Sequence, residues 1–191
     1  MNKSTRPPVS CLAFFLASLL SLVIAGLVFK TVFVAYTLSQ FPQQSFADIG
    51  YALIWGLRFD LAAAAVFSLI ACLLLWLFTF ARPLKSPWTL LAIMLLVQGS
   101  LQIGDTVYFV EAGRHVSYEM RDALADASGL FMTAVTKHAL FLVVSCLLLI
   151  VLSLVLVKAA QKLEAVFRGV SFVPAFKGQG IAEFFLILFL A

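Results

Sequence analysis

Ionisable side chains that could carry chemistry adjoin long apolar segments of this sequence. They are Lys30, Arg58, Asp60 and Asp105. Each apolar segment is long enough to cross most of a bilayer core at about 1.5 Å of rise per helical residue. All four charges are therefore expected at one depth, close to the same membrane surface. Charges at such positions are costly in lipid and often serve a function.

Two interpretations fit this pattern. In the first, each side chain extends alone to the interface, beside an aromatic belt that includes Tyr36, Tyr51 and Trp55. In the second, the charges face the interior of a helix bundle. Arg58 and Asp60 are two residues apart and point to different sides of their helix, so each needs a partner, and Asp105 is the expected partner of Arg58.

The second interpretation predicts a cluster that binds a lipid headgroup or docks another domain. Its members are Lys30, Arg58, Asp60, Asp105, Tyr108 and Arg114. Arginine donates paired hydrogen bonds to phosphate, so the expected ligand is an anionic phospholipid headgroup.

No catalytic residue and no metal site are predicted in this chain. The sequence has no nucleophile elbow and no phosphate-binding glycine loop. His115 and His138 have no carboxylate or cysteine at metal-ligand spacing. The odd number of cysteines, three, implies no disulfide framework.

The composition requires a membrane to hold these residues in place. Of 191 residues, 63% are hydrophobic and 12% are charged, which excludes a soluble domain. The net charge of +4 is scattered without a basic stripe, so nucleic acid is not an expected partner. The predicted fold is an all-α polytopic membrane helix bundle. Four full spans are expected at 11–36, 49–81, 88–109 and 139–157, with a truncated fifth at 181–191.

The distribution of Lys and Arg predicts the orientation of the spans. Basic residues concentrate before residue 11, in 82–87 and in the connection 158–180, so these segments and the N-terminus are expected in the cytoplasm. The connection 110–138 is then external. Within it, Val116, Met120 and Leu124 recur every four residues and predict an amphipathic helix over 117–127 on the outer membrane surface.

Small residues at four-residue spacing predict where the helices approach closely. One stripe lies in the first span and a second lies in the next span. The stripes are Ala13, Ala17, Ser21 and Ala25, and Ala64, Ser68 and Cys72.

Two short motifs carry a resemblance to a known family. They are Gly56-Leu-Arg58-Phe-Asp60-Leu61 and Asp105-Thr-Val-Tyr108-Phe109-Val-Glu-Ala-Gly113-Arg114. In their order and placement, the chain resembles the N-terminal transmembrane domain of the lipoteichoic acid synthase family, especially its Gram-negative phosphoglycerol transferase-like members. The resemblance covers the whole chain in span number and spacing.

The resemblance implies a bacterial cytoplasmic (inner) membrane protein with five helices and a cytoplasmic N-terminus. A sulfatase-like external domain of the alkaline phosphatase superfamily is expected after the fifth helix. Its threonine nucleophile and its manganese ligands match no position in this sequence. The parent enzyme is expected to move phosphoglycerol from a phospholipid to a glycolipid or glucan acceptor. This chain is expected to anchor the enzyme and present the lipid, with membrane phospholipids and the external domain as its partners.

Two alternatives remain open on the sequence alone. Phosphoethanolamine transferases share the five-helix plan, and these residues do not separate the two headgroups. A stand-alone small membrane protein, such as a channel or transporter subunit, is the other alternative, and the half-length run 181–191 argues against it.

Overall fold

The computed structural model describes residues 11–40, 45–81, 87–116 and 127–168. Within these ranges the secondary structure is helical and no strand is present. The helices are α1 (Cys11–Thr37), the short 3-10 helix η1 (Leu38–Gln40), α2 (Phe46–Ala81), α3 (Trp88–Ala112), α5 (Ala127–Lys137) and α6 (Ala139–Arg168).

Four of these helices are long and apolar enough to cross a membrane. Their candidate spans are Ala13–Thr37, Phe46–Leu75, Trp88–Ala112 and Ala139–Leu163. The prediction of an all-α membrane bundle with four full spans is confirmed. The expected fifth span at 181–191 and most of the expected amphipathic helix at 117–127 lie outside the described residues.

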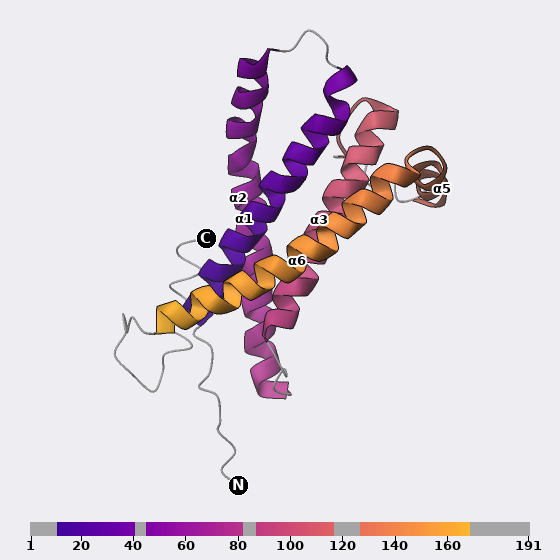
Figure 1. The fold of residues 1–191 in the computed structure, drawn as a ribbon. Coiled ribbons are helices and arrows are strands. Elements are labelled where there is room, and N and C mark those ends of the chain that lie inside the picture. The colour runs from indigo at the N-terminus through magenta and orange to yellow at the C-terminus, as the bar shows by residue number, and fades with distance from the viewer. Residues whose placement is uncertain (1–10, 41–44, 82–86, 117–126, 169–191) are drawn as a thin grey trace.

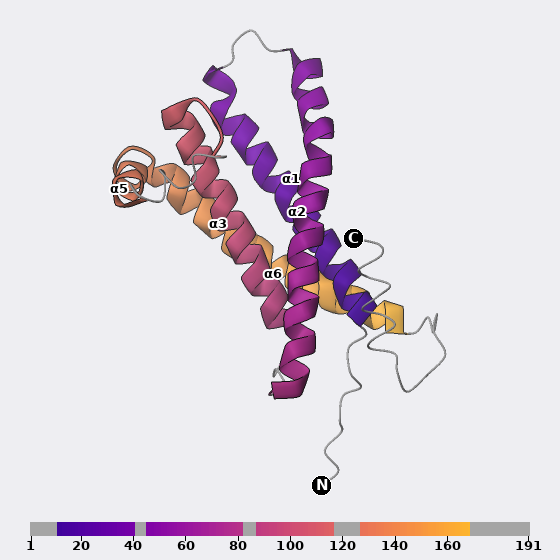
Figure 2. The same cartoon turned by 180° about the vertical axis from the view of Figure 1, so that it is seen from behind.

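Helix α1 is the centre of the bundle, because it packs against α2, α3 and α6. Helix α6 crosses the others obliquely and packs on α1 and α3 (Figures 1 and 2). Thr37, Phe46, Ala112 and Ala139 mark the ends of the long helices on one side of the bundle, which we name the polar end. In Figure 1 this end faces upward.

The two small-residue stripes lie in the helix contacts, as predicted. Ala17 and Ala64 have no exposed surface, and Ala25 is 2% exposed. Such residues let helix backbones approach closely in lipid, where van der Waals packing drives association. The contact of α3 with α6 also depends on a small residue, because a Cβ at Gly99 would collide with the buried side chain of Leu149.

Large apolar residues fill the end of the bundle opposite the polar end. Phe14, Leu91 and Leu95 are almost fully buried there, and the ring of Phe14 lies 5.5 Å from that of Trp88, centroid to centroid. The outward faces are also apolar: on α6, Leu140, Leu147 and Leu154 are exposed. A helix that is apolar on its outward face as well as its inward face is suited to a lipid surround.

Local hydrogen bonds define where the helices begin and end at the polar end. Before α2, the Ser45 backbone N–H donates to the Asp48 carboxylate and the Asp48 N–H donates to Ser45 Oγ, which forms a reciprocal cap.

The connection 110–138 contains a helix that the sequence did not predict, α5. Only His138 separates α5 from α6, and its N–H still donates to the carbonyl of Ala134.

Candidate lipid-headgroup site

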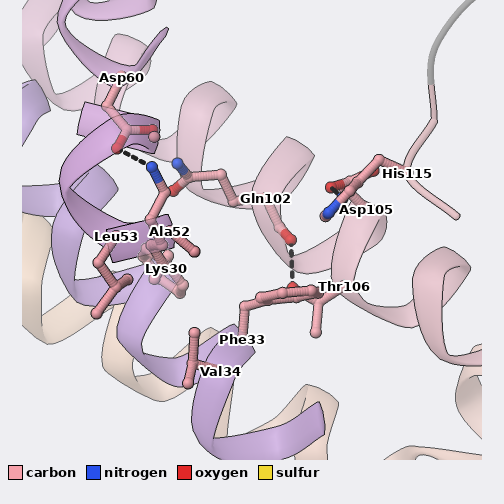
Figure 3. A pocket seen from close by; sticks show the side chains of 12 residues that line it. Lys30, Phe33, Val34, Ala52, Leu53, Asp60, Gln102, Asp105, Thr106 and His115 are labelled. Carbon is pink, nitrogen blue, oxygen red and sulfur yellow. Dashed lines mark hydrogen bonds and ion pairs between the residues drawn. The ribbon is translucent and has the colours of Figure 1, made fainter. Parts of the chain in front are cut away.

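A cavity of about 360 Å³ lies between α1, α2 and α3 at the polar end. One part of its wall is apolar and the other part carries ionisable and amide groups (Figure 3). The described residues that line it are Phe29, Lys30, Phe33, Val34, Ala52, Leu53, Gly56, Asp60, Gln102, Asp105, Thr106 and His115. We name this cavity the polar-end pocket.

Lys30 and Asp60 form an ion pair that joins α1 to α2 at one side of the pocket (Figure 3). Their side chains retain 22% and 11% of their surface exposed, so the pair is largely withdrawn from solvent. Gly56, one turn before Asp60, makes room for it: a Cβ at this position would lie 2.5 Å from Lys30 Nζ. A Cβ here would displace the Lys30 ammonium, so the absence of a side chain at Gly56 lets the lysine lie close to α2.

Asp105 is held by the chain segment that follows α3. Gly113 adopts a left-handed conformation, with φ of 71°, and ends the helix. The chain then turns back, so that His115 Nδ1 lies 2.6 Å from Asp105 Oδ2 and the Val116 N–H donates to Asp105 Oδ1. The hydrogen bond to Asp105 raises the pKa of His115 above its ordinary value.

Amide side chains continue the polar lining from the pocket into the bundle. The Gln102 side chain points toward the Lys30–Asp60 pair (Figure 3). Gln98, one turn earlier on α3, donates from Nε2 to the carbonyl of Leu22 at 3.2 Å. Among the described residues, the buried Oε1 atoms of both glutamines have no hydrogen-bond donor.

The predicted pairing of Arg58 with Asp105 is wrong. Arg58 is exposed and its guanidinium lies over the rings of Trp55 and Phe59, 4.7 Å and 4.8 Å from their centroids. The two-residue spacing from Asp60 does place the two side chains on different sides of α2, but Arg58 faces away from the pocket. Asp105 binds His115 in its place.

The structure brings together only part of the predicted cluster. Lys30, Asp60 and Asp105 line one pocket, while Arg58, Tyr108 and Arg114 are not among its described lining residues. Tyr108 is half-buried near the end of α3, and Arg114 is exposed beyond it.

A second polar cluster at the polar end joins α1, α3 and α6. Tyr36 Oη lies 2.7 Å from His138 Nδ1, and His138 Nε2 lies 2.9 Å from Glu111 Oε1. Lys137 Nζ donates to the other oxygen of Glu111 at 2.9 Å, and the ring of Tyr36 stacks on that of Phe141. These contacts, which we name the Tyr36 clamp, fix the start of α6 against α1 and α3.

Sequence reasoning missed the role of His115, of the glutamines and of the Tyr36 clamp. A signal existed for the glutamines, since Gln98, Gln102 and Asp105 follow one another at helical spacing on one face of α3. No local signal pairs Tyr36 with His138, which is 102 residues away in the sequence. In the described ranges, no three potential metal ligands lie together.

Comparison with protein-family profiles, with curated proteins and with solved structures gives no match to this chain.

Proposed function

We propose that this chain is the membrane domain of a phosphoglycerol transferase-like enzyme, which it anchors and to which it presents a phospholipid headgroup. The observation that carries the proposal is the polar-end pocket, with its apolar wall and its Lys30–Asp60 pair. A phospholipid combines the same two properties, because its acyl chains are apolar and its headgroup is charged. The resemblance at the motifs around Asp60 and Asp105 supports the same activity for the parent enzyme.

The polar-end pocket lies near the membrane surface in this proposed arrangement. We place the polar end on the outer side of a bacterial cytoplasmic membrane, with the N-terminus in the cytoplasm; the distribution of Lys and Arg supports this orientation. Lys30 and Asp105 each lie seven residues before the end of their helix, which is about 10 Å along the axis. That depth suits a headgroup in the outer leaflet and an external catalytic domain above it.

Filling the pocket without changing its charges tests lipid binding. Ala52→Trp places a large side chain on the pocket wall, whereas Ala63→Trp adds the same group to an exposed position of α2 that does not line the pocket. We expect native mass spectrometry of the purified chain to detect a retained phospholipid in wild type and Ala63→Trp, and its loss in Ala52→Trp. Equal retention in both variants would refute a headgroup site in the pocket.

Two further experiments test the rest of the proposal. In a background without the native cysteines, a cysteine at Gln43, between α1 and α2, should react with an impermeant thiol reagent in intact cells, and one at Ser86, between α2 and α3, should not. Labelling at Ser86 without lysis would reverse the orientation.

The reading frame after Ala191 tests whether this chain belongs to a larger enzyme. A sulfatase-like sequence there supports the proposed parent enzyme, and a stop codon contradicts it.

A further inference from the structure

Arg58 is a cation on an uncovered, apolar side of a candidate membrane span. It belongs to the span Phe46–Leu75 of α2, and it faces away from the polar-end pocket. The apolar and aromatic residues beside it are 47% to 73% exposed, so a surrounding bilayer would cover them. We name this surface the Arg58 face, and it consists of Tyr51, Ile54, Trp55, Arg58 and Phe59.

The position of Arg58 along α2 corresponds to the level of phospholipid headgroups. The apolar stretch from Leu61 to Ala81, the last residue of α2, extends for about 30 Å at 1.5 Å per residue. That length equals the thickness of a bilayer hydrocarbon core, so Arg58 lies at the edge of the core when this stretch fills it. Side chains on a helix point toward its N-terminus, which directs the guanidinium of Arg58 toward the membrane surface.

The guanidinium of Arg58 has aromatic contacts but no anionic partner among the described residues. It lies 4.7 Å from the ring centroid of Trp55 and 4.8 Å from that of Phe59. The rings attract its charge but supply no oxygen to accept its N–H groups, and no acceptor in the described ranges pairs with them. Asp60, two residues later, is paired with Lys30 on the pocket side. Because an uncompensated cation is costly beside lipid, the counterion is expected from the bilayer.

We propose that the Arg58 face binds the phosphate of an anionic phospholipid on the bilayer side of α2. The phosphodiester accepts paired hydrogen bonds from the guanidinium, and the acyl chains lie along Phe59 and the apolar surface that follows it. An anionic lipid neutralises Arg58. A zwitterionic lipid brings an additional cation to a face that offers it no carboxylate in the described residues, so it binds less well.

This lipid site is separate from the headgroup site of the proposed function. Of the Arg58 face, no residue is among the described residues that line the polar-end pocket. The inference therefore stands or fails independently of lipid binding in the pocket. The contact resembles an exposed ion pair, which is weak, so the lipid exchanges with its neighbours in the bilayer and is lost on purification in detergent.

Quenching of Trp55 fluorescence by brominated lipids tests the inference, because bromine quenches at short range and Trp55 belongs to the Arg58 face. Trp76→Phe and Trp88→Phe leave Trp55 as the single tryptophan. The full chain is reconstituted into phosphatidylcholine vesicles. Phosphatidylglycerol or phosphatidylcholine, brominated near the glycerol end of identical acyl chains, is then added in steps. We expect phosphatidylglycerol to associate about threefold more strongly, and equal association would overturn the preference for an anionic lipid.

A substitution of Arg58 connects the preference to its residue. Arg58→Gln removes the cation, so the preference for phosphatidylglycerol should fall to about one. Lys137→Gln is the matched control, because it removes the same charge from an exposed position at the polar end, and it should keep the preference. Thermal unfolding of both variants checks that they remain folded. An unchanged preference in folded Arg58→Gln, or an equal fall in both variants, would refute the role of Arg58.

Two other results would identify a different occupant of the Arg58 face. If neither brominated lipid quenches Trp55, protein covers this face, as in a pair of chains, and the lipid site is overturned. Soluble glycerophosphoglycerol carries the same phosphodiester without acyl chains, so at the concentration of the lipid it should not reduce quenching by phosphatidylglycerol. Displacement of the lipid by this compound would overturn the assignment to a phospholipid.

Discussion

The Lys30–Asp60 pair allows a quantitative test of how the pocket is held together. Replacing Lys30 with methionine keeps most of the side-chain volume and leaves the Asp60 carboxylate without its cation. Replacing Asp60 with asparagine removes the carboxylate and leaves the Lys30 ammonium without its anion. The two changes should differ in cost, because the long stem of an unpaired lysine can carry its ammonium toward the polar end, while the short aspartate side chain stays where only 11% of its surface is exposed.

The exposure of the pair sets the expected magnitude. An exposed ion pair is worth about 0 to 1 kcal/mol, and removing one partner of a buried pair costs about 3 to 5 kcal/mol. With side chains 22% and 11% exposed, the pair lies between these limits. We expect a loss in the free energy of unfolding of about 2 kcal/mol for Lys30→Met and about 1 kcal/mol for Asp60→Asn. The double variant should lose only about 1 kcal/mol, which gives a coupling energy of about 2 kcal/mol.

The assay is unfolding of the purified chain by SDS in mixed micelles, followed by far-ultraviolet circular dichroism. Lys137→Met is the matched control, because Lys137 pairs with Glu111 at the same end of the bundle with its own side chain 62% exposed. This control should lose about 1 kcal/mol or less. Equal costs for Lys30→Met and Lys137→Met, or a double variant whose loss equals the sum of the single losses, would refute a shielded pair.

Three further changes test the surroundings of the pair. Gly56→Ala should destabilise the chain by about 1 kcal/mol in the same assay, because the new methyl group displaces Lys30, whereas Gly50→Ala, which meets open space, should be neutral or stabilising. Gly99→Ala directs a methyl group into a buried leucine of α6 and should cost about 1 to 3 kcal/mol; a stabilised variant would contradict the tight contact of α3 with α6. The raised pKa of His115 contributes stability that is complete below its ordinary value of 6.5 and is lost as pH rises through the folded-state pKa. Between about pH 6 and pH 9, the melting temperature of wild type should therefore fall more than that of His115→Gln, and parallel curves would exclude this coupling.

The fold could be predicted from the sequence because membrane thickness leaves few choices. A long apolar run must form a helix that satisfies its own backbone, so the helices follow directly from the runs. The small-residue stripes also predicted the packed faces, since Ala17 and Ala64 are fully buried. Helix α5 was not predicted, because it is only 11 residues long and contains Ser, Gly and Thr residues, which have low helix propensity.

The pairing of charges at the site was harder to predict than their depth. Several residues share that depth, and the rotation of each helix decides which of them meet. A usable signal was present in α2, where Asp60 precedes Ala64 by four residues and so lies on the small-residue face, while Arg58 does not. The return of His115 to Asp105 depends on the left-handed Gly113, which no periodic pattern encodes.

The uneven support of its walls determines how the pocket responds to the bilayer. The Tyr36 clamp and the packing of α6 on α1 and α3 brace two of the walls. The third wall is the first half of α2, where Phe46 is 92% exposed and Ile54 is 73% exposed. This half of α2 extends beyond the Lys30–Asp60 pair with much of its surface uncovered by protein, so in a bilayer lipid would cover it. We therefore expect the thickness and lateral pressure of a surrounding bilayer to act on the pocket through α2, so that a thinner membrane changes the width of the pocket without unpacking the other three helices.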